Sequence, residues 1–197
     1  MHRAHPWHGV SWRTDDDNAV LAYVEIVPTD SVKYELDKAS GILRVDRPQK
    51  YSSLCPALYG LVPQTYCGSI VGEHTSRRIG RAVEGDKDPL DICILTERAI
   101  SHGDILVSCV PLGGLRIIDG DHADDKIVAV LVGDAAYGGY TDIAEVPTAV
   151  IGRLEHYFLT YKEFPAHSPR EVKLHGIYGA GEARQIIDLA AQDYANL

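Results

Sequence analysis

The sequence predicts a mainly β protein with some α-helix, in which a small antiparallel barrel or curled sheet carries peripheral helices. Short β-branched segments fill the first two thirds of the chain, whereas a helical period appears only near the C-terminus. With 197 residues, 45% of them hydrophobic, the chain is long enough to bury one core. We therefore expect a single domain over residues 1–197.

Six segments have the composition of strands, because each is short, rich in β-branched residues and bounded by turn residues. They are residues 19–27, 32–36, 42–45, 90–95, 105–110 and 127–132. Residues 37–41 (DKASG) have the composition of a hairpin turn, in which Gly41 can adopt a positive φ. The second and third strands should therefore pair.

Helical spacing from Val150 to Tyr161 predicts an amphipathic helix, and Pro147 suits its first turn. Its apolar face consists of Val150, Ile151, Leu154, Tyr157, Phe158 and Tyr161. A short strand is expected at residues 171–174 and a second helix from Gly179 to about Tyr194. Between the predicted strands at 42–45 and 90–95, residues 68–85 carry three arginines; we favour a solvated surface loop there, with a subunit contact or a flap as alternatives.

Composition excludes some functions. A net charge of −9 argues against nucleic acid and membrane surfaces as partners, because both attract basic proteins. No segment has the apolar length of a secretory signal or of a membrane span. The four cysteines are far apart in the sequence, which predicts buried free thiols in a reducing compartment and hence a cytoplasmic protein.

Two acidic segments offer the strongest chemical signal. The first contains Asp86, Asp88 and Asp91, and the second, residues 119–126, contains Asp119 and Asp124. Neighbouring carboxylates repel one another, and hard cations such as Mg²⁺ relieve that repulsion. Considered alone, the first segment also fits a solvated Asp-Pro turn and the second an exposed hairpin loop. Neither segment has the ligand and glycine spacing of an EF-hand.

Further charged and aromatic residues lie elsewhere: Glu25, Lys33, Glu35, Arg47, Tyr59, Lys126, Tyr161 and Lys162. Considered alone, the charged members of this set are equally typical of surface ion pairs, which contribute little to stability. Tyr161 lies on the apolar face of its predicted helix, so its default role is in the core. Order along the chain therefore matters more than any single motif.

In order, these segments resemble the soluble family I inorganic pyrophosphatases. The resemblance extends from about Val24 to about Lys162 and is weaker toward the C-terminus. It is carried by these motifs: Val24-Glu25-Ile26, Lys33-Tyr34-Glu35, Val45-Asp46-Arg47, Tyr59-Gly60, Asp86-x-Asp88-Pro89-x-Asp91, residues 119–126 and Tyr161-Lys162. The resemblance implies one pyrophosphatase domain built on a five-stranded barrel of the oligonucleotide/oligosaccharide-binding (OB) type, with peripheral helices, two of them near the C-terminus.

The resemblance also implies hydrolysis of diphosphate to two phosphates with several Mg²⁺ ions, for which Mn²⁺, Zn²⁺ or Co²⁺ are possible substitutes. Direct metal ligands would be Asp86, Asp91, Asp119 and Asp124, of which Asp91 and Asp124 would bridge ions. Glu25 and Glu35 would act through metal-bound water, and Asp88 would be the general base for an in-line attack by a metal-activated water. The substrate-binding residues would be Lys33, Arg47, Tyr59, Lys126, Tyr161 and Lys162.

Three positions depart from the usual family pattern. Lys87 stands where Gly is common, Cys55 where Tyr is common, and Gly120 where an acidic residue is common. Lys87 leaves room for an alternative, a non-catalytic module that binds divalent cations or polyphosphate. A nucleic-acid binder is a weaker alternative, because the chain is acidic and has few aromatic residues. Family members commonly form dimers or hexamers, so a homo-oligomer is expected.

Overall fold

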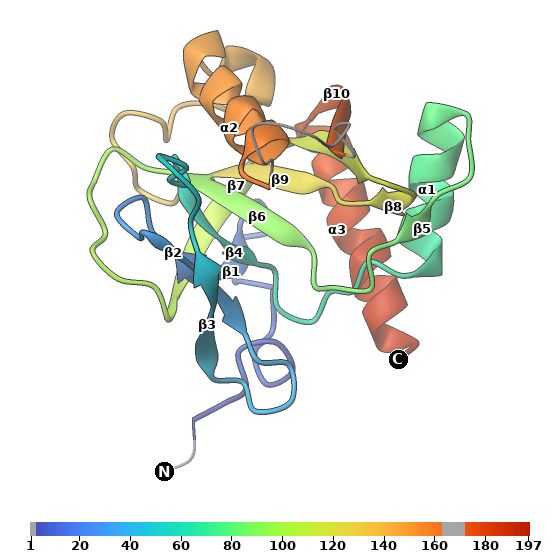
Figure 1. Ribbon diagram of the computed structural model, residues 1–197, viewed down its shortest axis with the longest axis horizontal. Helices are drawn as coiled ribbons and strands as arrows, with labels where there is room; N and C mark the ends of the chain where they lie inside the picture. Colours follow the sequence, from blue (N-terminus) through green and yellow to red (C-terminus); the bar gives the residue numbers. More distant parts are fainter. Residues whose placement is uncertain (1–2, 163–171) are drawn as a thin grey trace.

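Five strands close into a barrel. In this computed structural model, which describes residues 3–162 and 172–197, each strand pairs with the next, and β7 pairs back with β1. In ring order they are β1 (Val20–Ile26), β4 (Leu58–Leu61), β6 (Asp91–Leu95), β9 (Lys126–Leu131) and β7 (Ile105–Asp119). Closure leaves no free edge in the ring. The predicted five-stranded barrel with peripheral helices is confirmed (Figure 1).

The barrel is not wholly antiparallel, which corrects the expectation from the sequence. β6 and β9 pair in parallel, with Asp91 opposite Lys126. Strand 105–110 was also predicted too short. The strand seemed to end before Pro111, but the structure has only a register shift between Pro111 and Gly113. Beyond this shift β7 continues to Asp119. A bulge tolerates the missing proline N–H, so the ladder resumes after it.

Strands outside the ring extend its surface. β10 (Val172–Gly179) pairs with β7, and the short strands β8 (His122–Ala123) and β5 (Glu84–Gly85) follow at the far end of β7. A strand is present where one was predicted at residues 171–174, but β10 continues to Gly179; the predicted first residue, Glu171, lies outside the described residues. The close approach of Tyr178 explains Gly114, because a Cβ there would lie 2.3 Å from the phenolic oxygen.

β2 (Val32–Leu36) and β3 (Leu43–Pro48) form a separate hairpin, as predicted. Its turn has Gly41 at φ 69°, the left-handed conformation that glycine adopts without steric cost. The Asp37 carboxylate accepts hydrogen bonds from the backbone N–H and the hydroxyl of Ser40, at 2.9 and 2.7 Å. The hairpin tip is therefore a defined structure.

Both predicted C-terminal helices are present. α2 (Thr148–Thr160) follows Pro147 at its N-cap and a short 3-10 turn, η1 (Ile143–Glu145), and packs on one side of the barrel. α3 (Ala180–Ala195) covers another part of the sheet. The buried residues that face the core are Ile151, Leu154, Tyr157 and Phe158 in α2 and Ala183, Ile186, Ile187 and Ala190 in α3. Helical spacing alone was sufficient to predict both elements.

The prediction of a solvated loop at residues 68–85 is wrong. Residues Ser69–Ile79 form a helix, α1, which lies beside α3 (Figure 1). Three backbone N–H groups at its start, of Gly68, Ile70 and Val71, donate to the Asp193 carboxylate of α3 at 2.9–3.0 Å. Gly68 itself offers no side-chain cap. The cap comes from a distant segment, so the local sequence lacks the usual signal for a helix start.

Other expectations have mixed outcomes. All four cysteines are free and buried, as predicted. β4 was not predicted, because its four residues follow Pro56 and include Gly60. Among residues 3–162 and 172–197, no helix is both long and apolar enough to cross a lipid bilayer.

Lys87 has an unusual backbone. Its φ is 66°, in the left-handed region, which costs an L residue with a Cβ about 1–2 kcal/mol. The backbone between Asp86 and Asp88 is therefore not extended. Instead, the backbone N–H of Asp88 donates to Asp86 Oδ1 at 3.0 Å, which closes a tight turn.

Replacing Asp193 should destabilise the protein. Asp193→Ala removes the acceptor of three backbone N–H groups at the start of α1, and we expect a loss of about 2 kcal/mol in the free energy of unfolding. Urea unfolding followed by circular dichroism measures it. Asp188→Ala, an exposed change in the same helix, is the control. Equal midpoints for the two variants would contradict this account of the cap.

Replacing Lys87 with glycine should stabilise the protein. Lys87→Gly removes the left-handed penalty, and after the entropy cost of an added glycine we expect a net gain of about 0.5–1 kcal/mol. The control Lys87→Ala removes the same charge but keeps the strained Cβ. A gain in urea midpoint for both variants alike would assign the effect to charge rather than to the backbone.

Candidate active site

Two parallel strand pairings bring the acidic segments together. β5 pairs with β8, with Gly85 opposite Ala123, just before Asp86 and Asp124. β6 pairs with β9, with Asp91 opposite Lys126, which are the last residues of the two segments. Each segment is thus held at both ends beside the other. Carboxylates about thirty residues apart in sequence consequently face one cleft.

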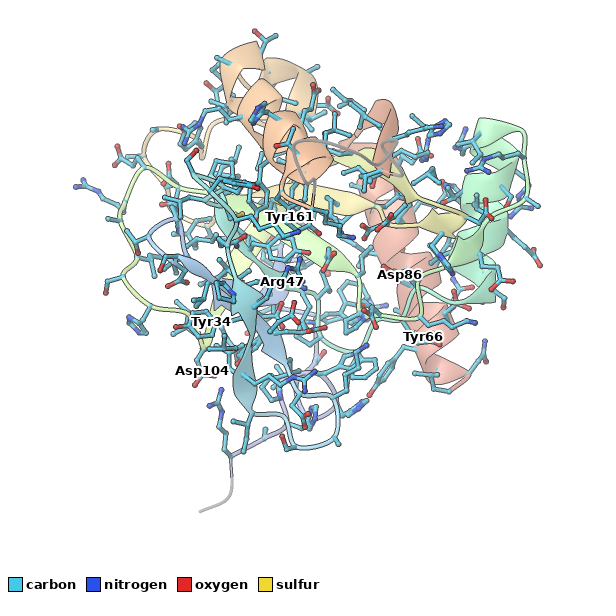
Figure 2. The ribbon with its side chains drawn as sticks, viewed as in Figure 1. Tyr34, Arg47, Tyr66, Asp86, Asp104 and Tyr161 are labelled. Carbon is cyan, nitrogen blue, oxygen red and sulfur yellow. The ribbon has the colours of Figure 1, made fainter. Side chains whose placement is uncertain are left out.

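This cleft has a volume of about 600 Å³. Every predicted site residue lines it, from elements that are distant in the sequence. They are Glu25, Lys33, Glu35, Arg47, Tyr59, Asp86, Asp88, Asp91, Asp119, Asp124, Lys126, Tyr161 and Lys162. Figure 2 shows three of them, Arg47 of β3, Asp86 after β5 and Tyr161 at the end of α2, around the centre of the molecule.

Lys126 lies at the base of the cleft and is 2% exposed. Its ammonium contacts the carboxylates of Asp91 and Asp124. Burial favours the neutral amine, but the two carboxylates outweigh burial and raise the pKa of Lys126 well above its usual value. The same contact holds the pKa of Asp124 below its usual value against the effect of burial. Lys126 is therefore an internal counter-ion for this pair.

Two further carboxyl groups in the cleft resist ionisation. Burial, with the nearby charges of Asp124 and Asp91, raises the pKa of Asp86 to about 8. Burial also raises the pKa of Glu25 to about 8, although its Oε1 accepts the backbone N–H of Leu36 at 2.7 Å. A bound cation would favour the ionised form of both groups. Negative charge in this cleft is thus incompletely balanced by its lysines.

The donor chemistry of the cleft fits a hard divalent cation. Its candidate ligands are carboxylate oxygens, which suit Mg²⁺, Ca²⁺ and Mn²⁺ better than softer metals. In the part of the chain that the structure describes, no three His, Cys, Asp or Glu residues already form a ligand cluster. The Lys126 ammonium contacts Asp91 and Asp124, and Lys162 Nζ lies 2.5 Å from Asp119 Oδ2. Cation binding would require these lysines to shift toward another anion.

Cations and aromatic groups surround the carboxylates. Lys33 Nζ lies 3.5 Å from Asp46 Oδ2, and Arg47 also contacts Asp46. The Arg47 guanidinium lies 5.7 Å from the centre of the Tyr161 ring. Tyr161 packs against the core, as its helical face predicts, and it also lines the cleft. This mixture of cations and hydroxyls can bind phosphoryl oxygens.

Sequence reasoning missed Lys38 and gave Asp46 no role. Lys38 lies at the β2–β3 turn, lines the cleft and contacts Asp88. The residues around it had the composition of a turn, and no pattern in them indicates that the tip reaches across the molecule. Asp46 is the middle residue of the motif Val45-Asp46-Arg47. Its place beside Arg47 was the one feature of the sequence that could have indicated a role in the site.

A buried polar network supports the second acidic segment from behind. Asp125 accepts a hydrogen bond from the hydroxyl of Thr75 in α1 at 3.4 Å, and its Oδ1 lies 3.9 Å from Arg116 Nε. Arg116 donates to Glu182 of α3 at 2.7 Å. Outside this buried network, the exposed Arg81, after α1, donates to Asp121 at 3.0 Å. The misassigned segment 68–85 therefore helps to position the acidic loop.

Two departures from the family pattern have structural explanations. Gly120 has φ 61°, so an acidic side chain at this position would meet a backbone penalty. Cys55 is buried in the core beside α2, where burial raises the pKa of its thiol to about 12. It does not line the cleft. Cys55 thus provides packing rather than a polar group for the site.

Known proteins are similar to this chain over most of its length. An inorganic pyrophosphatase of Chlamydia trachomatis is 51% identical over 199 aligned residues, which cover 98% of this chain and 95% of that protein. Soluble inorganic pyrophosphatase 2 of Chlamydomonas reinhardtii is 32% identical, and the alignment covers 93% of this chain and 85% of that protein. Both are similar to this chain over most of its length.

Solved structures show the same fold. The crystal structure of inorganic pyrophosphatase from Thermus thermophilus superposes with a TM-score of 0.80 at 23% identity, covering 98% of this chain and 99% of that one. The sequence also matches the family described as inorganic pyrophosphatase over residues 22–195. The resemblance inferred from the order of motifs is thereby confirmed, and this chain belongs to the inorganic pyrophosphatase family.

Proposed function

We propose that the protein is a Mg²⁺-dependent hydrolase that converts diphosphate to two phosphates. The observation that carries this proposal is the cleft itself, in which carboxylates, most of them partly buried, lie beside lysine, arginine and tyrosine side chains. The carboxylates suit divalent cations, and the cationic side chains suit the oxygens of a small, highly charged anion. Family membership supports the same reaction.

Four aspartates are the proposed ligands of Mg²⁺: Asp86, Asp91, Asp119 and Asp124. Glu25 and Glu35 line the same cleft and would act through water. When bound, the ions neutralise substrate charge and lower the pKa of water toward neutrality. The raised pKa of Asp86 supports this assignment, because its carboxyl group lacks sufficient positive charge nearby.

Asp88 is the proposed general base. It faces the cleft, and its side chain is 43% exposed, so a water molecule can reach it. As the water oxygen forms a bond to phosphorus, Asp88 accepts the water proton, and the bridging P–O bond breaks with its electron pair going to the departing phosphate. Attack in line with the departing oxygen requires the substrate to be held in one orientation.

The other side chains of the cleft would hold the substrate. They are Lys33, Arg47, Tyr59, Lys126, Tyr161 and Lys162. Arginine and lysine donate charge-assisted hydrogen bonds to phosphoryl oxygens, and these strengthen as charge builds on the departing phosphate. Their ion pairs with Asp46, Asp91, Asp119 and Asp124 keep them in the cleft before substrate arrives.

The alternative is a module that binds divalent cations or polyphosphate without turnover. Lys87 is the departure that would favour it, yet the Lys87 side chain is 66% exposed and lies 3.6 Å from Glu84. It does not line the cleft. The main argument for a non-catalytic protein is therefore weak, and the two functions differ in whether phosphate is released.

The proposal also covers the domain organisation, the oligomeric state and the cellular compartment of the enzyme. We place one catalytic domain over residues 1–197 and expect a homo-oligomer, a dimer or a hexamer, in the cytoplasm. The four buried free thiols are compatible with a reducing compartment. The acidic charge of −9 argues against nucleic acid and membrane surfaces as partners.

Phosphate release should depend on Asp88 and on Mg²⁺. We expect Asp88→Asn to lower kcat at least about a hundredfold, because the amide cannot accept the water proton. Excess chelator should abolish activity of the unmodified protein, and Mg²⁺ should restore it. The control Asp188→Asn, outside the cleft, should match the unmodified protein. Saturable Mg²⁺ binding without phosphate release would favour the binding module instead.

Loss of Lys126 should make stability depend on Mg²⁺. Lys126→Met leaves the partly buried carboxylates of Asp91 and Asp124 without their cation, and we expect about 3–5 kcal/mol lower stability in chelator. Mg²⁺ should raise the melting temperature of this variant more than that of the unmodified protein, because it can replace the missing charge. Lys173→Met, an exposed change, is the control. An equal Mg²⁺ response in all three proteins would count against metal binding at these aspartates.

A further inference from the structure

Lys38 is a cation of the cleft that the proposed mechanism has not used. It belongs to the turn between β2 and β3, yet its ammonium contacts Asp88, which follows β5. Both side chains are 43% exposed. The contact therefore joins the hairpin tip to the proposed proton acceptor at a place that solvent and substrate can reach.

The backbone of Lys38 is well positioned for this contact. The turn is closed by hydrogen bonds from Gly41 N–H to the Asp37 carbonyl, at 2.8 Å, and from Asp37 N–H to the Ile42 carbonyl, at 2.9 Å. His5 Nε2 lies 3.2 Å from the carbonyl oxygen of Lys38. The N-terminal segment thus supports the tip from outside, and the long side chain can move while its backbone stays in place.

The partner of Lys38 distinguishes it from the other cations of the cleft. Lys33 and Arg47 contact Asp46, which has no proposed chemical role, whereas Lys126 and Lys162 contact proposed metal ligands. Lys38 contacts the group that must accept a proton. The Lys38 ammonium occupies Asp88 Oδ1, so its move to another anion would leave that oxygen able to accept a proton.

We infer that Lys38 is a further substrate-binding residue, whose ammonium leaves Asp88 for a phosphoryl oxygen when diphosphate enters the cleft. This inference rests on the proposed function. An exposed ion pair contributes little to stability, so breaking the contact between Lys38 and Asp88 costs little free energy. The Lys38 ammonium gains in return a contact with a more highly charged anion, the diphosphate. Binding of substrate would thereby release the proton acceptor, and Asp88 would be free only when there is substrate to attack.

Two substitutions at Lys38 and one control test the inference. Lys38→Met removes the charge at similar length, and Lys38→Arg keeps a cation. Lys87→Met removes one charge next to Asp88 but outside the cleft. The readouts are kcat and KM for diphosphate, and calorimetric binding of methylenediphosphonate, which cannot be hydrolysed at its bridge, with Mg²⁺ present.

We expect Lys38→Met to raise KM and to weaken methylenediphosphonate binding, each about tenfold or more, as for the loss of one charge-assisted hydrogen bond. Lys38→Arg should restore most of the affinity, and Lys87→Met should match the unmodified protein. Unchanged KM and unchanged binding in Lys38→Met would overturn the inference while leaving the proposed function intact.

The remaining outcomes are equally decisive. If Lys38→Met lowers affinity, Lys38→Arg fails to restore it and both lower the urea midpoint, Lys38 has a structural role and the inference is wrong. If the unmodified protein binds methylenediphosphonate but releases no phosphate from diphosphate, the proposed hydrolysis fails. The binding experiment still decides the role of Lys38, because weaker binding in Lys38→Met alone supports it and equal binding overturns it.

Discussion

The parallel pairing of β6 with β9 is the constraint on which the rest of the site depends. It sets Asp91 opposite Lys126, while the shorter pairing of β5 with β8 aligns the residues just before Asp86 and Asp124. Parallel neighbours cannot be joined by a tight hairpin, so the long strand β7 makes the connection within the same barrel. One arrangement therefore closes the barrel and brings the two acidic segments into one cleft.

That cleft concentrates charge that the protein alone cannot fully neutralise. Lys126 balances Asp91 and Asp124, and Lys162 balances Asp119, but Asp86 and Glu25 keep a pKa of about 8. Buried carboxylates of this kind cost stability, which is typical of functional sites. In the proposed function, the same lysines change partners: they balance aspartates before substrate binds and contact phosphoryl oxygens afterwards, while divalent cations take their place.

Support for the cleft comes from outside the barrel. α1 is capped by Asp193 of α3, and Arg81 and Thr75 connect this region to the second acidic segment through Asp121 and Asp125. Arg116 continues the network into α3 through Glu182. The segment that looked like a solvated loop is thus part of the scaffold. Its contacts hold an acidic loop whose side chains would otherwise repel one another and separate.

By itself, the sequence determined the elements with a strong local period and the residue types of the site. Strand β2 and helices α2 and α3 follow from local spacing, and the order of motifs was sufficient for the family. The roles of the individual site residues stay predictions. Only the tertiary structure decided the parallel register of Asp91 with Lys126, the helix at α1 and the approach of Lys38 to Asp88. Each depends on a contact between distant segments, and periodicity or composition within one segment carries no information about its distant partner.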